Sequence, residues 1–402
     1  MNTNYKKVLL GDVVKINSSS YSTKDNLKYV NYLDTGNITD NVIDEIQRID
    51  LSVDRLPSRA KRKVKYNSII YSTVRPNQRH FGIIKEQPEN FLVSTGFAVI
   101  DVIEELADAD FIYYWLTQNK VVELLHAIAE QSVSAYPSIK PSNIENLEIF
   151  LPELSEQKKI ASILNVISKK LVVNNRINSN LEQQAQVIFN NLARNSNFKK
   201  PLSDFINIKH GFAFKGDYIS TEDNGVVLVT PGNFCIGGGF KESKCKFFTG
   251  DYPVDYVLKA NSLIVTMTDL SKEADTLGYS ALVPFSNQRI YLHNQRIGLV
   301  ELINDKLPIS YIYWYMRSYE YHMSIIGSAS GSTVKHTSPG RILEQLIPIP
   351  NKKDLLQYAP VLDDMNVTIS KNNTENIQLY LLRKTLLPQL VSGQLDLSNI
   401  EF

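Results

Sequence analysis

The chain has few cysteines and no long apolar segment. Its two cysteines, Cys235 and Cys245, have no metal-ligand spacing around them, so we expect reduced thiols in the cytoplasm rather than a disulfide framework. The apolar stretch Val8–Leu10 is interrupted at once by Gly11-Asp12, which argues against a signal peptide. No run approaches the ~18 apolar residues that a membrane span needs, so no span is predicted.

An excess of positive charge is also missing. Lysine and arginine number 43 against 42 acidic residues, a net charge of +1. A protein that bound DNA by charge alone would be more basic. If the chain binds DNA, its positive charge must be concentrated locally, or partner proteins must contribute part of the binding. The length of 402 residues predicts two or three domains.

Motifs for catalysis are absent from the sequence. There is no Asn/Asp-Pro-Pro-aromatic motif of an amino-methyltransferase and no Gly-x-x-x-x-Gly-Lys-Ser/Thr loop, and Gly237–Gly239 favours a turn. The six histidines show no paired spacing for a metal, so no metal site is predicted. Glu242-Ser243-Lys244 matches a Glu-x-Lys fragment of nucleases, and a nuclease is the weakest of the hypotheses considered.

The chain repeats itself. Residues 141–192 align without a gap with residues 339–390, at an offset of 198. Weaker similarities lie upstream in the same order, such as residues 111–115 with 311–315. Each half is therefore predicted to be a divergent globular part followed by a better-matched tail.

The tails have the spacing of long helices. Apolar residues in both recur alternately at three and four positions, which is typical of a coiled-coil seam. Both seams carry central asparagines, predicted to set helix register by pairing if the helices run antiparallel: Asn174, Asn178, Asn372 and Asn376. The alternative is that each helix packs only on its own domain.

The globular parts are predicted to be mixed α+β. Short β-rich runs recur, such as residues 68–74 and 262–268, separated by turn formers. Aromatic helical segments follow at residues 110–130 and 308–326.

One segment and the C-terminal tail give the sequence a family resemblance. Ile149-Phe150-Leu151-Pro152, followed by Glu156-Gln157 and a long helix, resembles the hinge of type I restriction-modification specificity (S) subunits. The run from Leu382 to Leu395 is similar to the end of that family, and the resemblance covers nearly the whole chain.

The resemblance implies an architecture. It consists of two pseudo-repeated target-recognition domains, 1–152 and 197–350, with a central spacer helix at 153–196 and a distal spacer helix with tail at 351–402. The two helices would pack as an antiparallel coiled coil. Asn351-Lys352-Lys353-Asp354 stands where the family has its Glu-Gln pair, and Pro360 predicts a helix start or kink nearby.

The resemblance also implies a function without catalysis by this chain. Each target-recognition domain would read one half of a bipartite site on double-stranded DNA in the major groove. Methyltransferase (M) subunits and restriction/translocase (R) subunits would be the partners, and S-adenosylmethionine, ATP and Mg²⁺ would be bound by them. No cofactor is expected on this chain.

Base edges are read by arginine, asparagine and glutamine, and phosphates by basic side chains. In the first half, the predicted base-reading loop is Arg75, Asn77, Gln78, Arg79 and His80. The predicted phosphate contacts are Arg59, Lys61, Arg62, Lys63 and Lys65. A solvated surface run is the alternative for this basic segment.

Two polar segments at similar positions precede the helices and are predicted to touch DNA as well. The first contains Tyr136, Ser138 and Lys140, and the second contains Ser332, Thr333, Lys335 and His336. Further candidates in the second half are Lys272, Arg289, Asn294, Gln295 and Arg296. The competing overall hypothesis is a coiled-coil scaffold with two heads that bind something other than DNA.

Overall fold

The computed structural model describes residues 5–132, 136–196, 198–242, 245–269, 271, 273–331, 334–395 and 397. It divides into two compact units. Unit 1 consists of Met1–Lys170 with Leu381–Phe402, and unit 2 consists of Leu171–Tyr380. No helix in the described ranges is both long and apolar enough to cross a membrane.

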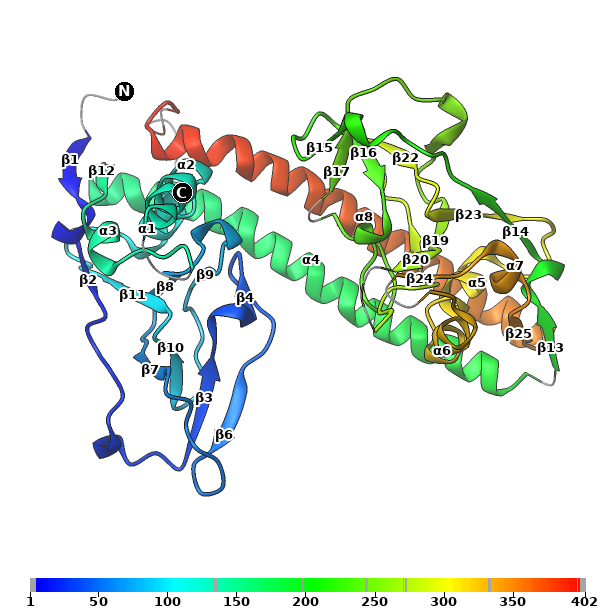
Figure 1. Ribbon diagram of the computed structural model, residues 1–402, viewed down its shortest axis with the longest axis horizontal. Helices are drawn as coiled ribbons and strands as arrows, with labels where there is room; N and C mark the ends of the chain where they lie inside the picture. Colours follow the sequence, from blue (N-terminus) through cyan, green and yellow to red (C-terminus); the bar gives the residue numbers. More distant parts are fainter. Residues whose placement is uncertain are drawn as a thin grey trace. The chain divides into compact units, whose positions relative to one another are not determined.

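The described part of unit 1 contains two four-stranded sheets and two small two-stranded ones (Figure 1). The first sheet has the order β2-β11-β8-β9, with the bounds Val14–Ile16, Phe97–Val102, Ile69–Ser72 and Phe81–Ile83. The second has the order β6-β3-β10-β7, with the bounds Gln47–Asp50, Tyr29–Leu33, Phe91–Ser94 and Ala60–Lys63. The small pairs are β1 (Lys6–Leu9) with β12 (Glu148–Leu151), and β4 (Ile38–Thr39) with β5 (Val42–Ile43).

Unit 2 repeats this plan. Its sheet β14-β23-β19-β21 has the bounds Ile206–His210, Ile297–Leu302, Leu263–Thr266 and Ser280–Leu282. Its five-stranded sheet β15-β17-β16-β22-β18 has the bounds Ile219–Ser220, Lys246–Phe248, Val226–Val229, Ile290–His293 and Val257–Leu258. The small pairs are β13 (Phe198–Pro201) with β25 (Leu346–Ile349), and β20 (Thr268–Asp269) with β24 (Lys335–His336).

Three short helices accompany the sheets in each unit. In unit 1 they are α1 (Ala109–Leu116), α2 (Asn119–Glu130) and α3 (Pro141–Glu145). In unit 2 they are α5 (Ile309–Tyr315), α6 (Tyr319–Ser328) and α7 (Pro339–Leu343). The aromatic residues of α1 and α5 are buried in the two cores, with Trp314 and Phe111 among the largest fully buried side chains. The predicted α+β class and the internal repeat are both confirmed.

Two long helices complete the chain, α4 (Leu154–Arg194) and α8 (Lys352–Val391). Gln157 fixes the start of α4, because its side chain accepts from Asp108 N (2.8 Å) and donates to Pro152 O (2.8 Å). In the second half its repeat position is Leu355, which packs against the unit 2 core instead. Asn351 caps α8 by accepting from Asp354 N at 2.9 Å, so the missing Glu-Gln pair is replaced by another cap.

α8 begins at Lys352, inside the predicted distal segment, and continues through Pro360 and Pro388, so of the two alternatives predicted for Pro360 the helix start is wrong. Pro360 removes the hydrogen bond to the Leu356 carbonyl. Both residues lie on the exposed side of α8, where water satisfies that carbonyl, and this lowers the cost of the proline.

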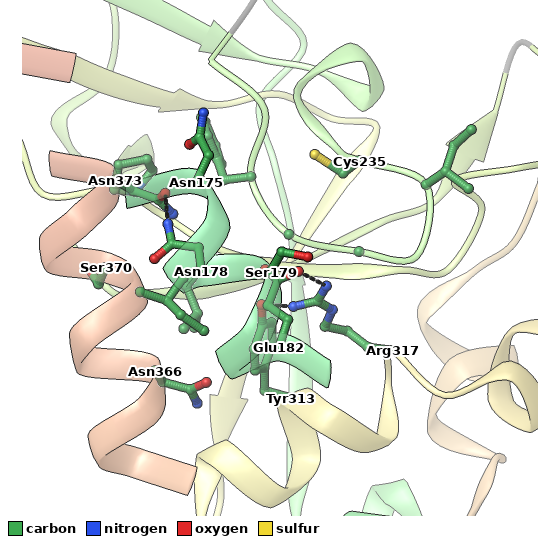
Figure 2. A pocket seen from close by; sticks show the side chains of 17 residues that line it. Asn175, Asn178, Ser179, Glu182, Cys235, Tyr313, Arg317, Asn366, Ser370 and Asn373 are labelled. Carbon is green, nitrogen blue, oxygen red and sulfur yellow. Dashed lines mark hydrogen bonds and ion pairs between the residues drawn. The ribbon is translucent and has the colours of Figure 1, made fainter. Parts of the chain in front are cut away.

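Within unit 2 the two helices meet at a seam of asparagines (Figure 2). Four amide-to-amide hydrogen bonds cross it, from the Nδ2 of one residue to the Oδ1 of the next: Asn174 to Asn376 (2.9 Å), Asn372 to Asn178 (2.8 Å), Asn178 to Asn373 (2.8 Å) and Asn376 to Asn175 (2.9 Å). Residue numbers rise on α4 as they fall on α8, so the predicted antiparallel packing is confirmed.

The seam has the symmetry of the repeat. Exchanging each asparagine with its partner at an offset of 198 turns the bond from Asn174 to Asn376 into the bond from Asn372 to Asn178. The same exchange relates the other two bonds. Apolar residues flank the asparagines in unit 2, with Leu181 and Ala185 of α4 and Met365 and Ile369 of α8 in one cluster. Two equivalent helices related by a local two-fold axis therefore form the seam.

We predict that Asn174→Leu lowers the free energy of unfolding by ~1–3 kcal/mol, since the amide of Asn376 loses its partner. Adding Asn376→Leu is expected to recover part of that loss. Adding Asn372→Leu, a residue with no bond to Asn174 among the described contacts, is expected to give an additive loss. Urea unfolding of the three single and two double variants measures both couplings, and equal coupling for the two pairs would contradict the assignment.

Candidate nucleic-acid interface

In unit 1 the predicted base-reading loop and the polar segment that contains Tyr136 and Ser138 lie side by side. The loop after β8 and the segment before α3 join through a β-bridge between Val74 and Ser138 and a bond from Arg75 N to Pro137 O at 2.9 Å. The Arg75 guanidinium lies over the exposed Tyr136 ring, 5.1 Å from its centre. An arginine and an aromatic ring thus share one edge of the sheet.

The tip of this loop presents amides to solvent. The loop forms a single 3-10 turn, Pro76–Gln78, in which Asn77 and Gln78 are exposed and Pro76 is buried. Arg75 and Arg79 flank the turn with φ of 47° and 59°, in the left-handed region. This backbone is held by the surrounding structure, because non-glycine residues adopt it at a cost.

Arg79 is bonded within the protein rather than facing outward. Its Nε donates to Asp40 Oδ1 (2.7 Å), Nη1 to Asn119 Oδ1 (3.2 Å) and Nη2 to the Thr117 carbonyl (3.3 Å). His80 Nδ1 lies 2.6 Å from the carbonyl oxygen of Ile38. The geometry therefore gives these two residues an anchoring position, and Arg75, Asn77 and Gln78 are the loop residues that face solvent.

The basic run reaches the same edge. Arg59 accepts through its carbonyl from Thr95 N at 2.8 Å, and Thr73 N donates to Gly96 O at 2.8 Å, so the turn at 95–96 joins the run to the loop after β8. Arg59, Lys61 and Lys65 are exposed, whereas Arg62 is half-buried. Lys63 Nζ is paired with Asp25 Oδ1 at 2.7 Å. Lys140 is exposed at the start of α3.

Unit 2 builds the corresponding edge from other side chains. Met267 N donates to Arg296 O (2.9 Å) and Thr337 N donates to Met267 O (3.0 Å), which repeats the bonds from Thr73 to Gly96 and from Ile139 to Thr73 in unit 1. Gln295 and Arg296 are exposed, and Asn294 is buried and accepts from Arg296 N at 3.0 Å. Thus the backbone of the edge is the same, and glycine in one unit corresponds to arginine in the other.

The polar segment before α7 also lies at this edge of unit 2. Lys335 and His336 form β24 and pair with β20, and His336 Nδ1 lies 3.2 Å from Thr268 Oγ1. His336 is exposed and Lys335 is half-buried. The predicted contacts Lys272, Ser332 and Thr333 lie outside the described residues.

Arg289 belongs to an internal ion cluster. Its side chain is only 9% exposed and pairs with Asp223 Oδ2 (2.9 Å) and with Glu242. Burial lowers the pKa of Arg289, but the two carboxylates outweigh it and the pKa is raised. The Tyr291 hydroxyl donates to Glu242 Oε1 at 2.7 Å, so the carboxylate of the Glu-x-Lys fragment is already bonded. Lys244 lies outside the described residues.

A cavity of about 250 Å³ lies in unit 2 between α4, the loop 235–240 and α8 (Figure 2). Arg317 spans its wall and donates to Gly237 O (2.9 Å), the Tyr313 hydroxyl (2.8 Å) and Glu182 of α4 (3.1 Å). Burial raises the pKa of the Cys235 thiol, which keeps it protonated at neutral pH. Among the described residues, no three His, Cys, Asp or Glu side chains cluster as a metal site would need.

The sequence did not single out one exposed residue of the unit 2 edge, Phe212. It follows β14 and pairs by a bridge with Asn294, beside the exposed Gln295 and Arg296. The signal available was local, a basic pair and a glycine immediately before an aromatic residue, at Lys209-His210-Gly211.

We predict that Arg79→Ala and Arg75→Ala differ in their effect on stability. Arg79→Ala removes bonds from its guanidinium to two side chains and a carbonyl, and is expected to lower the free energy of unfolding by on the order of 1 kcal/mol, since the pair with Asp40 is partly exposed. Arg75→Ala starts from the same left-handed backbone and is expected to leave stability nearly unchanged. Urea titration measures both, and an equal loss for the two variants would show that Arg75 is also an anchor.

Known proteins resemble the chain in sequence and fold. A family model described as "Type I restriction modification DNA specificity domain" matches residues 2–183 and 195–380. The type I restriction enzyme HindI specificity subunit of Haemophilus influenzae is 28% identical over 190 residues, 46% of this chain and 40% of that protein. The EcoBI specificity subunit of Escherichia coli is 27% identical over 200 residues, 49% of this chain and 39% of that protein. The chain thus spans less than half the length of these two relatives.

A solved structure shows the same fold over nearly the full length. The crystal structure of a type-I restriction-modification system S subunit from M. genitalium aligns with a TM-score of 0.59 and 15% identity, covering 97% of this chain and 96% of that one. Because one family model matches each half and together the matches cover most of the residues, the chain belongs to the family of type I restriction modification DNA specificity domains.

Proposed function

We propose that the chain is the DNA-sequence-specificity subunit of a type I restriction-modification system and performs no chemistry itself. Each unit reads one half of a bipartite site on double-stranded DNA. The observation that carries this proposal is the edge built twice on one backbone plan with different side chains. Two domains that recognise different half-sequences need such a combination. The shared backbone holds the DNA-contacting side chains in place, and the identity of those side chains determines which bases are recognised.

In unit 1 we assign base reading to Arg75, Asn77 and Gln78, whose exposed groups have the donors and acceptors that base edges require. Arg59 and Lys61 supply phosphate contacts from the start of β7. In unit 2 we assign DNA contacts to Gln295, Arg296 and His336, which lie at the equivalent edge on other backbone positions. The near-neutral total charge is compatible with this function, since the positive groups of each edge are local.

Partner subunits dock on the long helices in this proposal. Within unit 2, α4 exposes Val172, Val173, Ile177 and Val187, and α8 exposes Leu356, Val361 and Val367. These apolar side chains offer a docking surface to methyltransferase subunits. A restriction/translocase subunit would then bind to the methyltransferase subunits. S-adenosylmethionine, ATP and Mg²⁺ would be bound by those partners. Action on cellular DNA places the complex in the cytoplasm.

We predict that Arg75→Ala, in the complex with its methyltransferase subunits, relaxes one half of the methylated site and leaves the other half specified. The loss is expected to be ~1–3 kcal/mol for a bidentate base contact. Methylome mapping of cells that express the variant measures this. Relaxation of both halves alike, or of neither, would remove Arg75 from base reading.

Lys61→Ala is the matched control on the same edge. Phosphates carry no sequence information, so this variant is expected to weaken binding to all sequences and to reduce the slope of log K against log salt by ~1. Binding titrations at several salt concentrations measure it.

A further inference from the structure

Phe212 is held at the edge of unit 2 by its backbone. Its N–H donates to His293 O (2.8 Å) and its carbonyl accepts from Gln295 N (2.9 Å), so the residue is fixed against the turn between β22 and β23. Gly211 makes this approach possible, because a Cβ there would lie 2.1 Å from the Asn294 carbonyl oxygen. The backbone therefore has little freedom to move the Phe212 ring.

The ring is supported by other rings and still exposed. Phe214 and Tyr256 lie with their centres 5.1 and 5.2 Å from that of Phe212, and Phe214 in turn contacts Phe248 at 4.9 Å. Despite these contacts Phe212 is 38% exposed. A phenyl ring forms no strong hydrogen bonds with water, so covering its outer face with another apolar group is favourable.

The neighbours of the ring are groups that recognise nucleic acid. Gln295 and Arg296 are exposed on the adjacent turn, and Lys209 Nζ lies 5.2 Å from the centre of the Tyr256 ring that supports Phe212. The edge therefore places an apolar ring among an amide, a guanidinium and an ammonium group. In the major groove the apolar group that base edges offer is the C5-methyl of thymine.

The fold itself does not require an aromatic residue here. In unit 1 the corresponding strand β2 is followed by Asn17-Ser18-Ser19-Ser20. There Asn17 accepts from Val99 N at 3.0 Å and Ser20 forms a bridge with Arg62. The sheet forms in both units, with serine and asparagine at this position in unit 1 and with phenylalanine in unit 2. The ring is therefore one of the features that distinguish unit 2 from unit 1.

We propose that Phe212 is a specificity-determining residue of unit 2, and that its exposed face contacts the C5-methyl of one thymine in the half-site that this unit reads. The assignment rests on the proposed function. It adds an apolar contact to the polar reading by Gln295 and Arg296, and it disfavours bases whose edge lacks a methyl group at that position.

The test compares thymine with uracil, which differs only by the absent methyl. Each thymine of the mapped site is replaced in turn by deoxyuridine, and binding of the full complex is measured for the wild type and for Phe212→Ala. One replacement is expected to weaken wild-type binding about four-fold, the equivalent of one buried methyl group. Phe212→Ala is expected to bind both versions of that duplex equally.

Phe285→Ala is the control, because Phe285 is a second exposed phenylalanine of unit 2 (46%) and contacts α8 through its carbonyl. It should keep the preference for thymine, and thermal unfolding confirms that both variants are folded. A Phe212→Ala complex that keeps every thymine preference would overturn the inference, as would a site where no replacement matters. If the wild-type complex shows no sequence-specific binding at all, the proposed function is overturned, and this inference with it.

Discussion

The amide seam between α4 and α8 is the interaction on which the rest of the structure depends. Asparagine in a helix interface costs stability unless its polar groups find partners, and here each of four side-chain amides donates a hydrogen bond across the seam, whereas the buried Oδ1 of Asn174 has no partner among the described residues. A shift of either helix by one turn would leave these groups unpaired, so the seam favours one register over its neighbours. The local two-fold symmetry follows from the repeat, because each helix brings the same residues to the same place. Arg317 then ties unit 2 to α4 through Glu182.

On this frame the two units differ where DNA contact is proposed. The bonds that join the loop edges are shared, while Gly96 corresponds to Arg296 and a serine run corresponds to the segment of Phe212. The arginines predicted to contact DNA fall into two groups. Arg79 and Arg289 are bonded to carboxylates of the protein, whereas Arg75 and Arg296 are exposed. Residues of one chemical type thus differ in whether the protein itself already binds their charge.

The long helices and the repeat could be predicted because their signals are local or periodic. The seam spacing predicted α4 within a few residues, and only the alternative that α8 starts at Pro360 was wrong, since exposure of the residue four positions earlier is not visible in a sequence. The loop at 75–80 and the segment at 136–138 were each predicted, yet their contact depends on a bridge between residues far apart in the chain. For the same reason the partners of Arg79 and Arg289 could not be foreseen, and the support of Phe212 by Tyr256 could not either.

If two readers are joined by the paired helices, then helix length sets the gap in the recognised site. The direct measurement is methylome mapping of a variant with seven residues inserted after Lys170 in α4 and seven after Tyr380 in α8, which keeps the asparagine seam intact within unit 2. Seven helical residues add about 10 Å, close to two full turns, or about three base pairs of DNA. We expect the complex of methyltransferase subunits with the wild-type chain to methylate a bipartite site, and the complex with the variant to methylate the same two half-sequences with a gap about three base pairs longer. An unchanged gap with altered half-sequences, or a continuous wild-type site, would contradict this function of the helices.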